Sequence, residues 1–397
     1  MFKEIEKAEN DPILGLTEEF KADYNKEKVN LAVGVYQDDF GNTPSFGTVL
    51  EAETFMLSKN YSKTYRPIDG DKLFTEKSIE LVLGNDIKSE KEGLLFGLNT
   101  PGGTGALRLA SDFLKTFEPN SSLWISNPSW PNHKSIFEAS GFKVKSYPYF
   151  DVNNNNVDFQ SLISQIKEIP RKDIVVIHGC CHNPTGADLT EDQWSILADV
   201  ILEKELFPIC DFAYQGLGNG IDEDAIGVRI LAKKLKELII CTSYSKNFGL
   251  YSERVGCLIF FSESIQSAES VLSQLKKTAR SNYSNPPAHG SDIVKTILNN
   301  SEMRSRWIAE LGNVRGRIRD VRSAFVSQLS EEGCRKDFSF IKNQNGMFSF
   351  TGLTPEQVNL LKENYSIYLV KSGRINVAGI TSSNINYVAK AISEVIK

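Results

Sequence analysis

Short apolar runs alternate with amphipathic segments from about residue 95 to residue 262. Strands that alternate with helices predict an α/β domain with a mostly parallel sheet. The runs expected to form strands are Leu94–Leu98, Leu123–Ser126, Val144–Tyr147, Ile174–His178, Phe207–Asp211, Leu238–Thr242 and Gly256–Phe261. Segments with helical periodicity between them include Thr104–Phe117, Pro131–Ser140, Phe159–Ile166 and Glu191–Lys204. The sequence therefore predicts a seven-stranded sheet between helices.

The two ends of the chain together predict a second, smaller domain. A long helical pattern runs from Asp292 to about Leu329, with Gly312 and Gly316 as candidate bends, and short strands and a last helix at Ser382–Ile396 follow it. For a chain of 397 residues two domains are the default. We expect a small α+β domain from residues 1–43 and 314–397, and a large domain from residues 44–313.

Composition, net charge and the first residues argue against several classes of function. The net charge of −5 argues against a nucleic-acid partner, which needs a dense basic face. No run approaches the ~20 apolar residues of a membrane span. The start, residues 1–7, is charged and has neither the apolar core of a signal peptide nor the Arg-rich pattern of a transit peptide. We expect a cytoplasmic protein without membrane contact.

Cysteine and histidine spacing predicts neither a disulfide framework nor a metal site. Six cysteines are few for a chain of this length, and bridging the neighbours Cys180 and Cys181 would be strained. The four histidines are scattered, without paired Cys or His spacing. His178 and His182 stand four residues apart, but they flank a strand end rather than share a helix face.

Lys246 is the most informative single residue. It stands among hydroxyl-bearing neighbours directly after an apolar run, Leu238–Thr242, that predicts a buried strand. A lone lysine in such a place is more often a solvated surface residue. A lysine at the mouth of a buried strand can also form a Schiff base with an aldehyde cofactor, and Ser243 and Arg254 nearby suit a phosphate.

Two further strand ends carry polar groups. Asp211 closes the run that begins at Phe207, and Tyr214 follows three residues later. A carboxylate there can hold a cationic partner protonated, such as the ring nitrogen of a pyridine cofactor, although it could equally cap a turn. Asn183 follows His178 and can donate to an oxyanion, or serve only as a turn residue.

A glycine-rich turn opens the helix that begins near Thr104. Its glycines, Gly102, Gly103 and Gly105, let backbone amides approach an anion closely, and a helix N-terminus favours negative charge. Arg108 stands where a dinucleotide fingerprint needs its third glycine, and no Gly-Lys-Ser/Thr follows, so neither standard nucleotide loop is present. A plain glycine helix entry remains the alternative.

Three more residues are candidates for ligand contact. Arg374 and Arg280 carry guanidinium groups suited to bidentate carboxylate binding, although each could form a structural ion pair. Trp130 follows a Pro-Ser turn and could stack on a planar ring or fill the core.

Taken together, these motifs resemble the fold-type I pyridoxal phosphate (PLP) enzymes. The likeness is to the class I aspartate aminotransferases and their aromatic relatives, and it spans nearly the whole chain, from Asp11-Pro12-Ile13-Leu14-Gly15-Leu16 to the segment near Gly379. The most specific motifs are Cys180-Cys181-His182-Asn183-Pro184-Thr185-Gly186, Asp211-Phe212-Ala213-Tyr214-Gln215-Gly216, Ser243-Tyr244-Ser245-Lys246-Asn247-Phe248-Gly249 and Asn282-Tyr283-Ser284-Asn285-Pro286-Pro287.

The resemblance assigns the cofactor contacts. It implies that Lys246 holds PLP as an internal aldimine and then shuttles the proton, and that Asp211 pairs with the ring nitrogen. Asn183 and the catalytic Tyr214 would donate to the phenolic oxygen, and Trp130 would stack on the ring, with Trp130 and Asn183 also near the substrate. The phosphate would be bound by Gly103, Thr104, Ser243 and Arg254. The large domain would thus be the PLP-binding domain.

The resemblance also implies the substrates and a partner. Arg374 would bind the substrate α-carboxylate, with Gly34 close by. Tyr65 would reach the phosphate, and Arg280 the distal carboxylate, of the neighbouring subunit, so the enzyme would be a homodimer with shared active sites. The reaction implied is ping-pong transamination between L-aspartate and 2-oxoglutarate, giving oxaloacetate and L-glutamate.

Three alternatives remain open from the sequence. The first is an aromatic-amino-acid aminotransferase, because Arg280 could move aside. The second is a PLP-binding protein without turnover. The third, a nicotinamide dehydrogenase, lacks its glycine fingerprint. Two departures from the family pattern bear on substrate preference: Arg66 follows Tyr65 where relatives usually carry an apolar residue, and Ala32 replaces a frequent glycine near Gly34.

Overall fold

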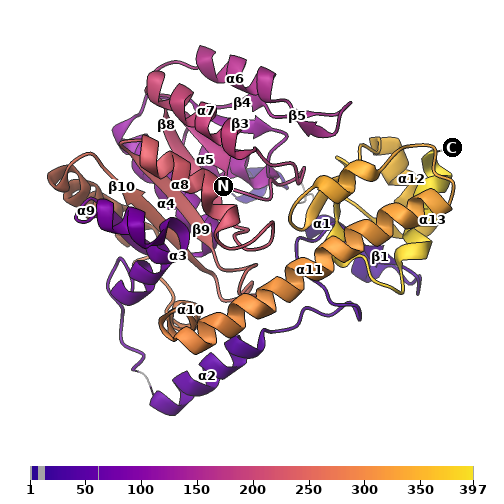
Figure 1. Cartoon of the computed structure of the whole chain (residues 1–397), viewed down its shortest axis with the longest axis horizontal. Helices are drawn as coiled ribbons and strands as arrows, with labels where there is room; N and C mark the ends of the chain where they lie inside the picture. Colours follow the sequence, from indigo (N-terminus) through magenta and orange to yellow (C-terminus); the bar gives the residue numbers. More distant parts are fainter. Residues whose placement is uncertain (1, 8–13, 61, 397) are drawn as a thin grey trace. The chain divides into compact units, whose positions relative to one another are not determined.

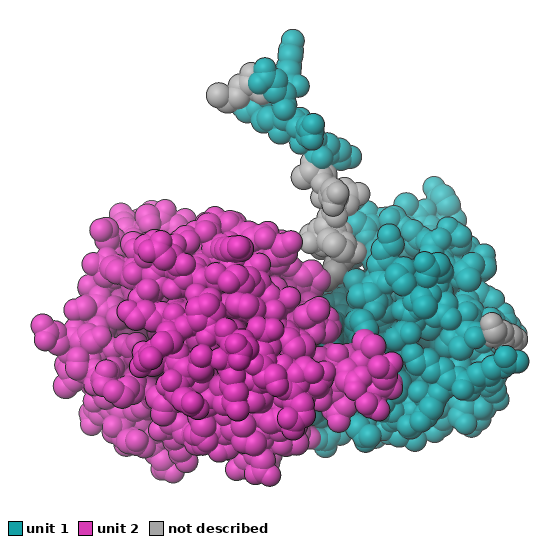
Figure 2. Space-filling view, turned by 90° about the horizontal axis from the view of Figure 1, so that it is seen from above, with its two compact units in different colours: residues 1–43, 184–186, 317–397 teal, residues 44–183, 187–316 magenta. Residues whose placement is uncertain are grey.

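The structure is a computed structural model that describes residues 2–7, 14–60 and 62–396. Asp11-Pro12-Ile13, at the start of the family likeness, lies outside the described residues. The chain divides into two compact units, which Figure 2 colours separately. The small unit holds residues 1–43, 184–186 and 317–397, and the large unit holds residues 44–183 and 187–316.

The large unit is built on a seven-stranded sheet with the order β2-β10-β9-β8-β7-β3-β4. All pairs are parallel except those of β10, which runs antiparallel to β2 and β9. The strands are β2 (Leu95–Pro101), β3 (Leu123–Asn127), β4 (Val144–Pro148), β7 (Ile174–His178), β8 (Phe207–Phe212), β9 (Leu238–Ser243) and β10 (Val255–Phe261). The predicted mostly parallel sheet of seven strands is confirmed.

Helices cover both faces of this sheet (Figure 1). Helix α4 packs on β9 and β10 and also contacts α5 and α9, whereas α3 and α8 pack on each other and α8 on α7. The helices of the large unit are α2 (Gly47–Lys59), α3 (Lys72–Glu90), α4 (Gly102–Phe117), α5 (Pro131–Ala139), α6 (Phe159–Glu168), α7 (Glu191–Glu203), α8 (Ile226–Lys234), α9 (Ile265–Asn282) and α10 (His289–Asn299). The short elements η2 (Glu223–Ala225), β5 (Phe150–Asp151) and β6 (Asn156–Val157) complete the unit.

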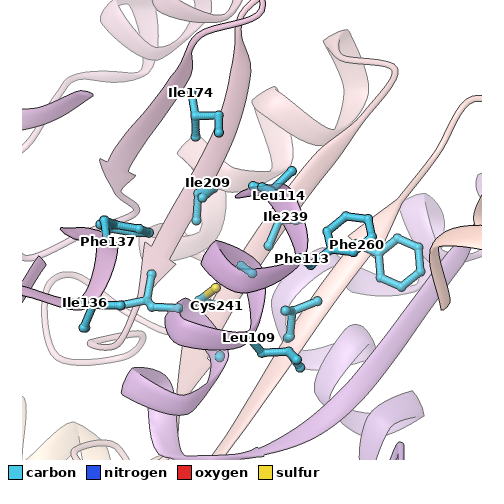
Figure 3. Close-up of a cluster of buried hydrophobic side chains, with 14 of the residues drawn as sticks. Leu109, Phe113, Leu114, Ile136, Phe137, Ile174, Ile209, Ile239, Cys241 and Phe260 are labelled. Carbon is cyan, nitrogen blue, oxygen red and sulfur yellow. The ribbon is translucent and has the colours of Figure 1, made fainter. Parts of the chain in front are cut away.

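The core beneath α4 explains why these elements form (Figure 3). Apolar residues recur on α4 with helical spacing, so one face of the helix is continuous hydrocarbon. That face meets β-branched residues at alternate strand positions, which all point to one side of the sheet. The cluster includes Leu109, Phe113 and Leu114 of α4 and Ile174, Ile209 and Ile239 of the sheet.

The long helical pattern after Asp292 differs from the prediction. The structure divides it at Asn300, whose backbone is extended and whose side-chain oxygen accepts hydrogen bonds from the amides of Glu302 and Met303. This cap starts a new helix, α11 (Ser301–Glu331). Gly312 and Gly316, the candidate bends, both lie inside α11.

The small unit contains two two-stranded sheets, β1-β12 and β11-β13. Its core joins the end of α11 to α12, α13 and the strands through residues such as Phe325, Leu361 and Ile392. The elements are η1 (Phe2–Glu4), α1 (Leu14–Ala22), β1 (Val29–Asn30), η3 (Ser339–Asn343), β11 (Phe348–Phe350), α12 (Pro355–Tyr365), β12 (Ile367–Tyr368), β13 (Arg374–Asn376), η4 (Val377–Gly379) and α13 (Ile385–Ile396). Among the described residues, no helix is both long and apolar enough to cross a membrane.

A buried arginine joins several segments of the small unit by hydrogen bonds. Arg322 of α11 is 2% exposed, and its guanidinium donates to the hydroxyl of Ser349 and to the carbonyl oxygens of Ile341, Gly346 and Phe348. With the carbonyl oxygen of Asn345 at 3.4 Å, one side chain thus donates to five acceptors in the segment from η3 to β11. Buried acceptors without a donor are costly, so this arginine holds the segment in place.

We expect Arg322→Leu to lower the free energy of unfolding by about 2–5 kcal/mol, because it leaves several buried acceptors unpaired. Urea denaturation followed by circular dichroism measures the change. Arg319→Leu, at an exposed position on the same helix, is the matched control and should shift stability by less than about 1 kcal/mol. Equal losses for the two variants would contradict this role for Arg322.

Candidate active site

A buried carboxylate stands at the carboxyl end of the sheet. Asp211 of β8 is 7% exposed, and its Oδ2 lies 2.8 Å from Nε2 of His133. An ionised carboxylate only accepts hydrogen bonds, so Nε2 carries the proton and donates it. The other ring nitrogen, Nδ1, then accepts from the hydroxyl of Ser129 at 2.9 Å. This chain of hydrogen bonds fixes both the ring and the carboxylate.

These contacts keep Asp211 ionised despite its burial. Burial alone raises the pKa of Asp211, but the hydrogen bond from His133 and the electrostatic interactions with His133, His178 and Lys246 more than offset it. The net pKa lies below the usual aspartate value. A carboxylate that stays charged in a buried place is suited to hold a cationic ring nitrogen in its protonated form.

Lys246 follows β9 in the turn after Ser243. Its Nζ lies 4.8 Å from the centroid of the Tyr214 ring. Burial lowers the pKa of Lys246, Asp211 opposes that shift, and Arg254 adds to it, so that the net pKa is below the usual lysine value. A depressed pKa leaves more of the amine unprotonated and nucleophilic at a given pH.

The start of α4 is packed tightly against β9 and β10. A Cβ at Gly256 would lie 2.5 Å from the carbonyl carbon of Gly102, and one at Gly103 would lie 3.0 Å from Cβ of Ser243. Gly102 has φ +75 and lies against the guanidinium of Arg254. The amides at the start of α4, the Ser243 hydroxyl and Arg254 therefore gather in one place. This combination is suited to a dianionic phosphate.

Further predicted residues lie at the same edge of the sheet. Asn183 and Tyr214 follow the neighbouring strands β7 and β8, and both are buried. Trp130 is partly exposed at the start of α5, with its ring edge-on to that of His133 at a centroid distance of 5.3 Å. The residues predicted to contact the cofactor thus belong to the large unit, and its sheet topology brings strand ends β7, β8 and β9 together.

Two predicted substrate residues belong to the small unit. Arg374 of β13 is 2% exposed, donates to the carbonyl oxygen of Ala32, and lies 4.3 Å from the centroid of the Phe348 ring. Gly34 packs against the same ring, since a Cβ there would lie 2.8 Å from it. Asn376 holds this segment by donating to the carbonyl oxygens on both sides of Gly34.

Tyr65 and Arg280, the residues expected to serve a second subunit, are both exposed, Tyr65 at 89%. Arg280 donates to the hydroxyl of Ser284. Arg66, the departure beside Tyr65, forms an ion pair with Asp292 at 2.7 Å.

Asp292 belongs to a small charge network. Lys295 pairs with Asp292 and with Asp71, at 2.7 Å each, and Arg66 lies 3.9 Å from Asp71. Two cations therefore face two carboxylates. The charge of Arg66 is therefore balanced by carboxylates within the large unit.

Sequence reasoning missed the histidines around Asp211. His178 stands opposite Asp211 in the β7–β8 register, and its ring lies 5.0 Å from that of His133 between centroids. Burial, followed by the electrostatic interaction with His133, lowers the pKa of His178 to about 3, so the ring is neutral at neutral pH. His182 lies next to it and bonds to the hydroxyl of Ser126 at 2.9 Å. The available signal was a serine, Ser129, just before the predicted helix and a histidine, His133, four residues later in its first turn.

Comparisons with known proteins agree with this geometry. The family model of the aminotransferases of class I and II matches residues 26–392. An aspartate aminotransferase of Salmonella typhi is 48% identical, and an aromatic-amino-acid aminotransferase of Escherichia coli is 41% identical, each over the full length of both chains.

A solved aromatic-amino-acid aminotransferase from Burkholderia pseudomallei, covalently bound to pyridoxal phosphate, is 43% identical, with full coverage of both chains and a TM-score of 0.97. The family expected from the motifs is confirmed. The buried acid, the lysine after β9 and the glycine-lined start of α4 are therefore features of a chain that belongs to the class I and II aminotransferases.

Proposed function

We propose that this chain is a PLP-dependent aspartate aminotransferase, which converts L-aspartate and 2-oxoglutarate to oxaloacetate and L-glutamate. The observation that carries the proposal is the pairing of an ionised, buried Asp211 with an amine of depressed pKa, Lys246, at one edge of the sheet. The several aspartate aminotransferases among the relatives support aspartate as the donor.

The residues of the large unit fit the cofactor. When bound, PLP supplies an aldehyde that takes up amino groups and a protonated ring that stabilises negative charge at the substrate Cα. Asp211 keeps the ring nitrogen protonated, and His133 keeps Asp211 ionised and aligned. We assign the large unit, residues 44–313 in the main, as the PLP-binding domain.

Lys246 has the acid–base role, and Tyr214 supports it. Lys246 would hold the cofactor through Nζ, and the same atom would take the proton from the substrate Cα and return it. Its depressed pKa suits this task, because a base is most effective when its pKa approaches the working pH. The Tyr214 ring lies 4.8 Å from Nζ. Its hydroxyl, together with Asn183, would donate to the phenolic oxygen of the bound cofactor.

The remaining polar groups bind and orient. Gly103, Thr104, Ser243 and Arg254 hold the phosphate, and Trp130 stacks on the ring. Arg374 binds the substrate α-carboxylate, and Gly34 leaves room for it. Arginine is suited to this role because its planar fork matches a carboxylate bidentately.

We propose that the active form is a homodimer with shared active sites. Helix α2 exposes apolar side chains, among them Leu50 at 52% and Leu57 at 83%. Exposed apolar groups of this kind mark contact surfaces. The exposed Tyr65 and Arg280 would then reach the partner's phosphate and the partner's substrate side chain.

We also place the enzyme in the cytoplasm. All six cysteines, including the neighbours Cys180 and Cys181, are free thiols, and five of them are buried. Free buried thiols are typical of a reducing compartment.

Amine reactivity tests the electrostatics of Lys246 directly. In the cofactor-free chain, Lys246 should be acylated by a trace amine reagent with a pH midpoint below that of Lys236. The pKa of Lys236 is raised by its hydrogen bond and ion pair with Glu263, so the two lysines are opposed internal standards. Mass spectrometry of peptides labelled across a pH series gives both midpoints. A Lys246 midpoint at or above that of Lys236 would contradict the proposed environment.

Steady-state kinetics tests the reaction and the donor. The PLP-loaded protein should convert aspartate and 2-oxoglutarate, with a kcat/KM for aspartate above that for phenylalanine. Lys246→Ala should lower kcat by about 10³-fold or more, because it removes both the nucleophile and the base. Lys236→Ala, at an exposed lysine, is the matched control and should keep full activity.

The outcome separates two functions. The aromatic-amino-acid aminotransferases at 41–43% identity favour the second candidate, an aromatic aminotransferase. A higher kcat/KM for phenylalanine would replace the aspartate assignment with that one. Parental turnover by Lys246→Ala would reject both.

A further inference from the structure

Three buried side chains of the large unit offer metal-binding atoms at one point. His133 of α5, His178 at the end of β7 and Asp211 of β8 each present one such atom, and these atoms all lie within 4.8 Å of one another. His133 is fully buried, and the other two are each 7% exposed. Two imidazoles and a carboxylate in this range need only small side-chain shifts to share one ion.

The fold builds this arrangement on rigid elements. His178 and Asp211 are direct neighbours across the parallel pair β7–β8. His133 lies in the first turn of α5, which packs on β3, the strand on the other side of β7. Sites mounted on strands and helices hold their ligand atoms more constantly than sites on loops.

His178 supplies an independent observation. Neither of its ring nitrogens has a hydrogen-bond partner among the described residues, although the ring is buried. The neighbouring rings differ, because His133 bonds to Ser129 and Asp211, and His182 bonds to Ser126. A buried polar group without a hydrogen-bond partner calls for an explanation. A ring nitrogen with an unused lone pair, close to two other metal-binding atoms, points to a ligand.

We propose that the cofactor-free chain binds a divalent transition-metal ion through His133, His178 and Asp211, and that this ion and PLP exclude each other. Two imidazole nitrogens with one carboxylate oxygen favour Zn²⁺, Co²⁺ or Ni²⁺, whereas Mg²⁺ and Ca²⁺ take oxygen ligands. The competition rests on the proposed function, in which Asp211 pairs with the cofactor ring nitrogen.

The hydrogen bonds adjust without net proton change. His133 must give up the proton at Nε2 to bind an ion there. The same ring can carry that proton at Nδ1 and donate it to the hydroxyl oxygen of Ser129, 2.9 Å away. In the metal-free chain the direction is the reverse, with the Ser129 hydroxyl donating to Nδ1. A ligating histidine commonly donates its other ring N–H in this way, which fixes the ring.

Visible spectroscopy with Co²⁺ tests the site. The probe is Co²⁺ added to the full-length, cofactor-free protein, with circular dichroism as the check of fold. We expect one ion per chain, an absorption band that Zn²⁺ displaces, and no such band in the PLP-loaded protein. Zn²⁺ bound beforehand should slow uptake of PLP in proportion to its occupancy.

Two variants identify the ligands. His178→Phe removes one imidazole, and His133→Gln removes the other while its amide can still donate to Asp211. Each should weaken Co²⁺ binding by about 100-fold or more, since even partners outside the metal shell are worth about 10- to 100-fold. His289→Gln is the matched control at an exposed histidine that pairs with Glu253, and it should bind as the parent does.

Several results would overturn the proposal. These are the absence of a band at about 1 mM Co²⁺, equal binding by the PLP-loaded protein, unchanged binding in both ligand variants, or loss of binding in His289→Gln. Failure of the protein to take up PLP at all would count against the proposed function instead. In that case the cobalt band and the variants still decide the metal site.

Discussion

The charge on Asp211 is the constraint on which the rest of the site depends. A buried carboxylate is unfavourable unless it is hydrogen-bonded, and here His133 donates to it at 2.8 Å. Ser129 holds the far side of the ring, so the carboxylate is oriented as well as charged. The same negative charge limits how far burial depresses the pKa of Lys246. The pKa of Asp211 and the pKa of Lys246 therefore each depend on the charge of the other group.

Sheet topology places these groups within reach of one another. The parallel strands β7, β8 and β9 end at the same edge, so residues far apart in sequence become neighbours there. The antiparallel strand β10 adds a second feature, because it can lie against the end of β2 and the start of α4 only if Gly256 passes the carbonyl of Gly102 without a side chain. That close passage places Arg254 beside the start of α4.

Much of this could be predicted from the sequence, since strand periodicity and residue type are local properties. Asp211 closes the apolar run that forms β8, and Lys246 stands shortly after the run that forms β9. Contacts that span distant segments leave no local pattern. The bond between His133 and Asp211 joins residues 78 apart, and the pairing of Arg66 with Asp292 joins residues 226 apart. The helix break at Asn300 was missed because apolar spacing continues across it.

The histidines show what linear spacing leaves out. His178 and His182 predicted no metal site because they flank a strand end rather than share a helix face. The structure instead places His178 beside His133, which comes from another element. Linear spacing detects ligands only when one element carries them.

Infrared difference spectroscopy of the cofactor-free protein, parent against Asp211→Asn, tests the central claim most directly. The account predicts that the side chain at position 211 gives the stretching bands of an ionised carboxylate at neutral pH. A carboxylic-acid carbonyl band assigned to Asp211 at that pH would contradict it.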